Sequence, residues 1–359
     1  MLKNGSVLTN IRYKVALVIM LSFGFAKAQD THFSQFYANP LYLSPSLAGA
    51  TDGGRFVLNY RNQWPSITKA YSSYAVSFDN FFNKFNSGLG VYLIQDKAGS
   101  AALTTTNAAF QYSYNFLINS EWQVVPGIQF EYGNKAIDFS KLRFSDEESG
   151  GGASGAWDRL DDNSVSYFDL AASAFLYNVK YWAGVTVSHL GRPNFSFLGE
   201  EMRMPVKMVA FGGMNVWSDR RKREGMNRSF SASFRYEQQQ RNKQIDVGVY
   251  WYNGPLELGF WYRGLPLFKV SNATSVNHDA IIALLAYNYG PYRIGYSYDI
   301  TLSGLGWQTA GAHEISVIYE FNQRFNLRLG GRRPAVPCSS TADPANSSKK
   351  YLKKHRKLM

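Results

Sequence analysis

The residues that could carry chemistry in this chain are acids and bases set at alternate positions inside apolar segments. In residues 292–300, Arg293 and Asp299 alternate with tyrosines and isoleucines. Because successive side chains of a β-strand point to opposite faces, such charges would share one face of a sheet. Ten residues fit this pattern in the segments expected to be strands: Arg61, Glu131, Arg235, Asp246, Glu257, Arg263, Arg293, Asp299, Glu314 and Glu320.

Two interpretations of these ten residues stay open. A selective channel would use them to attract a solute, whereas a packed interior would hold them as compensating ion pairs. Buried charges are tolerated when they are paired and hydrogen-bonded, and a mixture of both signs attracts no single class of solute well. We therefore favour candidate ion pairs in the lumen of a barrel, with a channel as the alternative.

Signatures of enzymes and cofactor sites are missing from the sequence. The five histidines are scattered, without a spacing that would ligate a metal. The glycine-rich stretches do not stand between a strand and a helix, as a phosphate-binding loop requires. The acidic segment 146–162 could bind calcium, but it lacks the ligand spacing of a calcium loop, which favours a solvated external loop. We expect no cofactor and no catalytic activity.

Segments of strand-forming residues follow one another through most of the chain. Aromatic residues make up 16% of the sequence, and such residues favour strands. The sequence predicts about 14 strands, an even number as bacterial outer-membrane barrels have. They are expected near residues 55–63, 71–81, 88–96, 103–118, 122–132, 167–177, 181–190, 206–217, 230–238, 244–252, 256–263, 279–288, 292–300 and 312–321.

The connections between these segments alternate in length. Tight turns are expected at 178–180 and 289–291, and they alternate with long links such as 133–166 and 264–278. Short turns at one end and long loops at the other are typical of outer-membrane barrels, where the turns are periplasmic and the loops extracellular.

Strand length separates a membrane barrel from a soluble sheet, because both show the same alternation. The predicted segments are close to the roughly 9 to 11 residues that a tilted membrane strand needs. After residue 28 no apolar run is long enough for a membrane helix, so a chain that spans the membrane must do so as a barrel. The predicted fold class is all-β, a transmembrane antiparallel β-barrel of about 14 strands. A soluble periplasmic sheet protein is the alternative.

The two ends of the chain carry signals different from those of the barrel. Early basic residues, the apolar run 15–25 and the small-residue pattern at 26–28 predict a signal peptide. The predicted organisation is a signal peptide at 1–28, a periplasmic N-terminal segment or plug at 29–54, the outer-membrane barrel at 55–321 and a basic periplasmic tail at 322–359.

The predicted tail explains the basic character of the whole chain. The formal net charge is +12, and the tail holds ten of the Lys and Arg residues against one acid, Asp343. Because the charge is confined to a terminal segment, we expect no nucleic acid partner. The tail is predicted to be disordered, and its basic residues would meet anionic lipid or a partner protein. The candidate contacts are Lys349, Lys350, Lys353, Lys354, Arg356 and Lys357.

Aromatic residues cluster just after the predicted cleavage site. Pro40 and Pro45 break any long strand or helix there. Exposed to water, these aromatic side chains would form an apolar patch of a kind that soluble surfaces avoid. We expect the segment to plug the barrel mouth or to bind a neighbouring protein, through Phe33, Gln35, Phe36, Tyr37, Asn39, Pro40 and Tyr42.

Three stretches of the sequence resemble a known family. They are Phe-Ser-Gln-Phe-Tyr-Ala-Asn-Pro-Leu-Tyr-Leu at 33–43, Tyr-Arg-Asn-Gln-Trp-Pro at 60–65, and Gly-Tyr-Ser-Tyr-Asp-Ile at 295–300 followed by His-Glu-Ile at 313–315. With these stretches the chain resembles the PorP/SprF family of Bacteroidetes, from residue 29 to about residue 337. The first two stretches are the more specific. The Lys-rich end has no counterpart in the family pattern.

The resemblance implies an outer-membrane protein of the type IX secretion and gliding motility machinery. Such a barrel is expected to support export or surface anchoring of a large adhesin through the adhesin's C-terminal domain. Its outer loops would hold that domain, and its periplasmic side would meet other secretion or motility components. Outer-membrane lipid is the other expected partner. The alternative function is an outer-membrane channel for small hydrophobic or ionic solutes.

Overall fold

The chain divides into two units, residues 1–32 and 33–359, and the second contains the fold. The predicted signal peptide, the acidic segment 146–162 and the candidate tail contacts lie outside the described residues. The computed structural model describes residues 30–51, 53–67, 71–99, 103–119, 121–137, 164–197, 201–220, 227–240, 242–265, 277–302 and 307–321.

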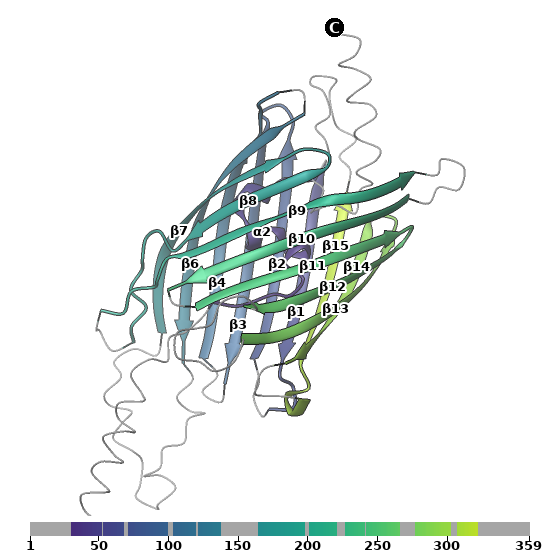
Figure 1. Cartoon of the computed structure of the whole chain (residues 1–359). Helices are drawn as coiled ribbons and strands as arrows, with labels where there is room; N and C mark the ends of the chain where they lie inside the picture. Colours follow the sequence, from purple (N-terminus) through teal and green to yellow (C-terminus); the bar gives the residue numbers. More distant parts are fainter. Residues whose placement is uncertain are drawn as a thin grey trace, which may run out of the picture. The chain divides into compact units, whose positions relative to one another are not determined.

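A single antiparallel sheet closes on itself to form a barrel (Figure 1). Strands that follow each other in sequence are neighbours in the sheet, and the ring closes where β1 pairs with β15. The strands are β1 Gly54–Gln63, β2 Tyr71–Phe82, β3 Ser87–Ala98, β4 Leu103–Tyr114, β5 Phe116–Leu117, β6 Gln123–Ala136, β7 Ser164–Tyr177, β8 Tyr181–Ser188, β9 Lys207–Arg220, β10 Asn227–Gln239, β11 Asn242–Asn253, β12 Leu256–Leu265, β13 Asn277–Tyr289, β14 Tyr292–Thr301 and β15 Ala312–Phe321.

Counting β4 and β5 as one interrupted strand gives 14 strands around the ring. Both pair with β6, and only Asn115 separates them. The backbone N–H of Asn115 donates to the carbonyl of Asn86 at 2.8 Å. The predicted fold class is therefore confirmed. The predicted strand 103–118 is divided in two, because Asn115 bonds to the neighbouring turn and interrupts the ladder.

Connections at the two ends of the barrel differ in length, with two exceptions. Strands at the periplasmic end are joined by short turns such as 178–180, whereas the extracellular end carries longer segments such as 189–206. At the extracellular end, however, the β3–β4 and β10–β11 connections are short. They turn at Gly99 and Gln240, whose positive φ values of 69° and 55° allow a tight reversal.

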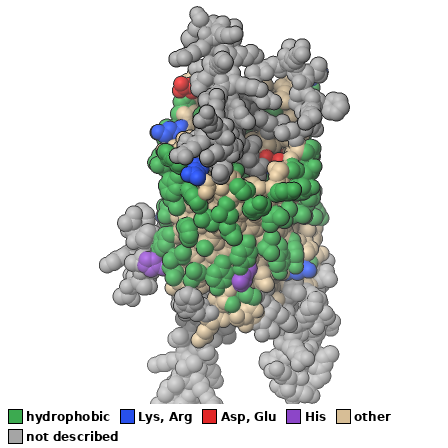
Figure 2. All heavy atoms as spheres, turned by 90° about the vertical axis from the view of Figure 1, so that its right-hand side faces the viewer, with side chains coloured by type: hydrophobic (Ala, Val, Ile, Leu, Met, Phe, Trp, Pro, Cys, Tyr) green, Lys and Arg blue, Asp and Glu red, His purple; other side chains and the backbone are tan. Residues whose placement is uncertain are grey.

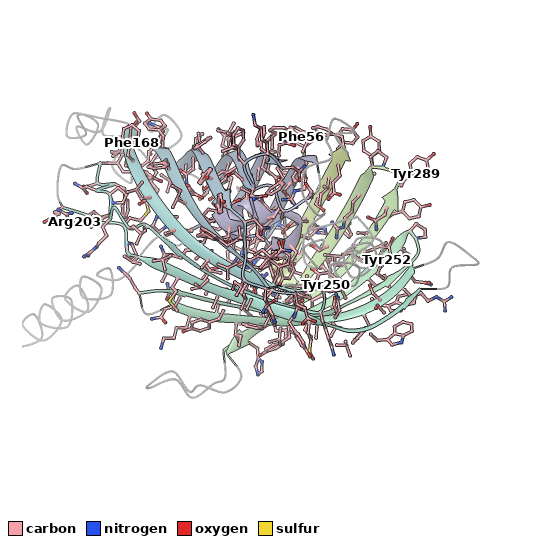
Figure 3. The ribbon with its side chains drawn as sticks, turned by 90° about the horizontal axis from the view of Figure 1, so that it is seen from above. Phe56, Phe168, Arg203, Tyr250, Tyr252 and Tyr289 are labelled. Atoms are coloured by element: carbon pink, nitrogen blue, oxygen red, sulfur yellow. The ribbon has the colours of Figure 1, made fainter. Side chains whose placement is uncertain are left out.

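Apolar side chains cover the outside of the barrel, and the polar and charged side chains of the strands face its lumen together with a group of buried aromatic ones. On β6, Phe130 is exposed, whereas Gln129 and Glu131 on either side of it are buried. Figure 2 shows apolar side chains as a band across the outer surface. In the view along the barrel, Phe168 and Tyr289 lie on the outer side of the ribbon (Figure 3). An apolar band over the height of the strands is the surface that a bilayer covers.

Short helical turns of the N-terminal segment lie inside the ring (Figure 1). They are η2 Phe36–Ala38, α2 Pro40–Leu43 and η3 Pro45–Leu47, and a further turn, η6 Trp307–Thr309, precedes β15. Pro40 and Pro45 each open a helical turn, where a missing N–H leaves no hydrogen bond unmade. Within the described part of the chain, no helix is long and apolar enough to cross a membrane.

Candidate functional site in the barrel lumen

The lumen is built around the N-terminal segment 33–50. Every residue of this segment except Tyr42 is buried. Its aromatic side chains join apolar clusters with lumen-facing residues of the wall, such as Trp182 of β8 and Trp261 of β12. The candidate plug residues are therefore covered by the inside of the barrel.

Glu314 of β15 holds the start of this segment. Its carboxylate accepts the backbone N–H of Ser34 at 2.7 Å and that of Gln35 at 3.0 Å. The Gln35 side chain donates to the Glu314 carbonyl at 2.9 Å and accepts from the Ser316 hydroxyl at 2.7 Å. Hydrogen bonds to an ionised acceptor are among the stronger ones, so this end of the segment is firmly attached to the wall.

The next residues are attached through aromatic rings. The Phe36 ring lies 4.8 Å from the Trp261 ring in an edge-to-face arrangement. The Tyr37 hydroxyl donates to the carbonyl of Gly212 at 3.3 Å and accepts from the indole N–H of Trp182 at the same distance. Edge-to-face pairs and satisfied polar tips are the arrangement that buried aromatic side chains prefer.

The second half of the segment is held through its backbone carbonyls. Gln111 donates to the carbonyl of Leu41 at 2.7 Å, Thr186 to that of Leu43 at 3.2 Å and Ser113 to that of Ala48 at 2.8 Å. These donors come from β4 and β8, on other sides of the ring from β15. The segment is thus attached around the wall and not along one strand.

Gly49 and Gly88 permit a close backbone approach where the segment meets the wall. Gly49 has a positive φ of 64°, and a Cβ there would lie 2.8 Å from the Gly88 Cα. A Cβ on Gly88 would lie 2.0 Å from the carbonyl oxygen of Ala48. A side chain at either position would push the segment away from β3.

Six of the ten candidate ion-pair residues meet in one group, which we name the lumen charge network. Asp299 binds Arg61 at 2.9 Å and Arg263 at 3.1 Å. Arg61 also binds Glu314 at 3.2 Å, and Arg263 binds Asp246 at 3.2 Å. Arg235 joins the group through Asp246 at 3.7 Å. The members are Arg61, Arg235, Asp246, Arg263, Asp299 and Glu314.

Ser34 ties the N-terminal segment into this network. Its hydroxyl donates to Asp299 at 2.5 Å and accepts from Arg61 at 2.7 Å and Arg263 at 2.8 Å. Arg235 donates to the carbonyl of Phe33 at 3.4 Å. Acids and bases alternate around this hydroxyl. Each buried charge is therefore paired with one of opposite sign, which offsets the free-energy cost of removing it from water.

The other candidate ion-pair residues lie elsewhere in the barrel. Arg293 and Glu257 form a separate pair at 2.9 Å. Glu131 accepts a hydrogen bond from the Tyr92 hydroxyl and another from Gln129 at 2.9 Å. Glu320 is half-buried on β15, opposite Arg55 in the β1–β15 register. The alternation in the sequence therefore predicted that these residues face the lumen. It did not predict which of them form ion pairs with each other.

The sequence reasoning missed a fully buried ion pair. Arg55 and Asp79 are 2.9 Å apart, and both side chains have no exposed surface. Asp79 also accepts the backbone N–H of Gly49 at 2.7 Å, which connects the pair to the N-terminal segment. The sequence contained a signal for this residue. Arg55 and Arg61 are an even number of positions apart on one strand, so alternation places both side chains on the lumen face.

The structure also pairs two residues that are distant in sequence, His189 and Asp169. The His189 ring nitrogen Nδ1 lies 2.6 Å from the Asp169 carboxylate, and both side chains are buried. In the described part of the chain, no three His, Cys, Asp or Glu residues group as metal ligands. The contacts within the lumen attach the N-terminal segment to the strands of the barrel wall.

A closed antiparallel barrel with an apolar outer band and a polar interior is an integral barrel of the bacterial outer membrane. Residues 25–319 match the family described as type IX secretion system membrane protein PorP/SprF. The chain belongs to this family, which confirms the resemblance seen in the sequence and the predicted localisation in the outer membrane.

Solved structures similar to this chain include other barrels. The chain is similar to the crystal structure of the P. putida toluene transporter TodX, with a TM-score of 0.45, 12% identity, and coverage of 78% of this chain and 93% of that chain. For the Acinetobacter baumannii outer membrane protein Omp33, the TM-score is 0.40 and the identity 7%, with 76% and 100% of the two chains covered. No curated protein matches the sequence.

Proposed function

We propose that this outer-membrane barrel is a non-enzymatic partner platform of the type IX secretion and gliding motility machinery. It supports export or surface anchoring of a large adhesin by holding the adhesin's C-terminal domain through its outer loops. Its periplasmic end meets other components of the machinery. Membership of a family of type IX secretion membrane proteins supports this assignment.

The observation that carries the proposal is the filled lumen. A polypeptide passing through the barrel would have to displace residues 33–50, which are buried and bonded to several strands. It would also separate Ser34 from the lumen charge network, leaving buried charges less well compensated. Both costs favour a barrel that binds an exported protein over one that serves as its pore.

A deletion of the gene tests the proposal. We expect the deletion strain to lose surface display of one adhesin, measured with antibodies on intact cells, while other outer-membrane proteins keep their levels. The adhesin's C-terminal domain should co-purify with the full-length barrel from the complemented strain. Purified barrel should conduct poorly in planar bilayers. Unchanged adhesin display together with a solute-selective conductance would favour the channel for small hydrophobic or ionic solutes instead.

A further inference from the structure

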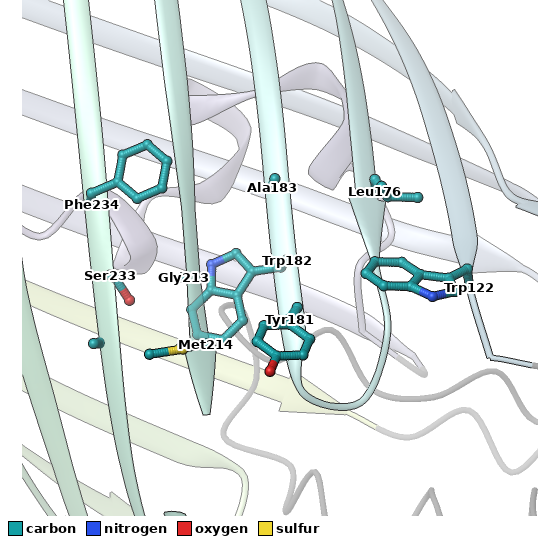
Figure 4. Close-up of a pocket in the computed structure, with 10 residues that line it drawn as sticks. Trp122, Leu176, Tyr181, Trp182, Ala183, Gly213, Met214, Ser233 and Phe234 are labelled. Atoms are coloured by element: carbon teal, nitrogen blue, oxygen red, sulfur yellow. The ribbon is translucent and has the colours of Figure 1, made fainter. Parts of the chain in front are cut away.

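The lipid-facing surface carries a hollow at the periplasmic ends of β7 and β8, beside the middle of β9 and β10 (Figure 4). Its volume is about 420 Å³. Exposed side chains of the outer face, such as Leu176, Met214 and Phe234, form its rim. The hollow therefore opens toward the bilayer and away from the N-terminal segment.

A small outward-facing residue, Ala183 of β8, lines this hollow. Ala183 pairs with Leu176 of β7 on one side and with Gly212 of β9 on the other, and Phe234 of β10 pairs with Gly212. The Phe234 ring covers Gly212, because a Cβ there would lie 3.0 Å from a carbon of that ring. The outer surface therefore dips at Ala183, between the larger Leu176 and Phe234 side chains.

The next row toward the periplasm closes the lower side of the hollow. It consists of Tyr181 and Met214, with the smaller Ala232 beside them on β10. Trp122, at the start of β6, forms the far side. Tyrosine and tryptophan are typical of the level where hydrocarbon meets lipid headgroups. The hollow thus ends at the headgroup level of the inner leaflet.

Lys180 stands at this headgroup end, on a turn of fixed shape. The Asn178 side chain accepts the backbone N–H of Lys180 at 2.8 Å and that of Tyr181 at 2.6 Å. The backbone N–H of Asn215 donates to the Lys180 carbonyl at 2.8 Å. The Lys180 ammonium lies 5.2 Å from the centre of the Tyr181 ring. An exposed cation is therefore kept beside the lower edge of an apolar hollow.

We propose that the hollow binds one acyl chain of an inner-leaflet phospholipid, with its phosphate against Lys180. Three features determine this choice of occupant. The hollow lies on the surface that hydrocarbon covers, its rim is apolar, and the exposed Lys180 beside Tyr181 supplies a cation complementary to phosphate. An ordered acyl chain at this site fills the space over Ala183.

Native mass spectrometry of the full-length barrel tests this site. Barrel purified in mild detergent is incubated with vesicles of phosphatidylethanolamine and phosphatidylglycerol, and the phospholipid retained per barrel is counted. Ala183→Phe fills the hollow and should lower retention at least tenfold. Ala283→Phe is the matched control, because Ala283 is an outward-facing alanine on β13, between the exposed Ile281 and Leu285. It should retain lipid as the unmodified barrel does.

Two further variants keep the test decisive. Ala232→Leu narrows the lower side of the hollow and replaces Ala183→Phe if that variant does not fold. Lys180→Glu should lower retention of phosphatidylglycerol by several-fold. Equal retention by all variants, or no retained phospholipid in the unmodified barrel, would overturn the proposal. Disulfide cross-linking of Met214→Cys to a second copy or to another protein would identify a protein as the occupant and also overturn it.

Discussion

Arg55 and Asp79 hold opposite charges where no water reaches either side chain. Arg55 also donates to the carbonyl of Leu47 at 3.3 Å, and Asp79 accepts from Gly49. The pair therefore connects β1, β2 and the end of the N-terminal segment. Each of these buried charges is stabilised by the other. Replacing one of them should therefore lower the stability of the barrel more than replacing both.

Asp79→Asn should destabilise the barrel by about 3 to 5 kcal/mol, because it removes the carboxylate that is paired with the buried Arg55 guanidinium. Unfolding by urea in lipid vesicles measures the loss. The double variant with Arg55→Met and Asp79→Leu should regain much of it. Glu201→Gln is the control, since Glu201 and Arg203 form an exposed pair 2.5 Å apart whose removal costs about 1 kcal/mol or less. Equal losses at both sites would contradict the prediction.

Which charges face the lumen could be predicted from the sequence, but which of them meet could not. Arg61 and Glu314 lie on adjacent strands, whereas Arg263 and Asp299 lie on β12 and β14 with β13 between them. Their contact depends on the curvature of the wall and on the Ser34 hydroxyl between them. Strand alternation contains no information on either.

Among the elements, the strands were the most predictable part of this molecule. Each predicted segment overlaps an observed strand, because the bilayer requires an apolar residue at every second position over a fixed height. The break at Asn115 and the short extracellular turns at Gly99 and Gln240 were not predicted. They depend on single backbone contacts and φ angles, which leave no periodic pattern.

Arginine on the outer face should be costly. Phe260 and Tyr112 are exposed on the lipid-facing side of β12 and β4. Phe260 lies mid-strand, and Phe260→Arg should cost about 2 to 4 kcal/mol near the middle of the bilayer. Tyr112 lies close to the periplasmic end of β4, so Tyr112→Arg should cost less, because the cost falls toward the interface. Immunoblots of outer-membrane fractions and unfolding in vesicles measure the effect. Phe260→Leu should keep normal levels. Normal levels of both arginine variants would mean that this face does not meet lipid.

At the scale of the whole molecule, the N-terminal segment and the wall can be separated by deletion. Removing residues 31–47 leaves every strand of the ring intact. We expect such barrels to assemble, and either to conduct ions in planar bilayers or to lose co-purification of a partner protein. Glu314→Ala is a milder variant, because it removes the acceptor of two backbone N–H groups. A tight, partner-binding barrel after deletion would show that the segment is dispensable.

The basic tail is tested by truncation after Pro337. The last strand, β15, ends at Phe321, so the truncated chain should insert into the outer membrane at a normal level. Adhesin display should fall if Lys349 and the basic residues after it recruit a partner or anionic lipid. Surface labelling and membrane fractionation measure the two outcomes separately. Normal adhesin display by the truncated protein would show that the tail is not needed for display. Failed insertion would show that assembly needs residues after Phe321.

The attachment of Ser34 to Glu314 joins residues 280 positions apart in the chain. The β1–β15 ladder, which closes the ring, joins the same two ends of the sequence. Contacts of such separation form late and slowly, because a long loop must be ordered first. We expect the segment to lie within the curved sheet before the last ladder forms, since a finished ring would have to admit it through its mouth. Enclosure of the segment and closure of the ring would then be one kinetic event, in which the wall is completed around its own N-terminus.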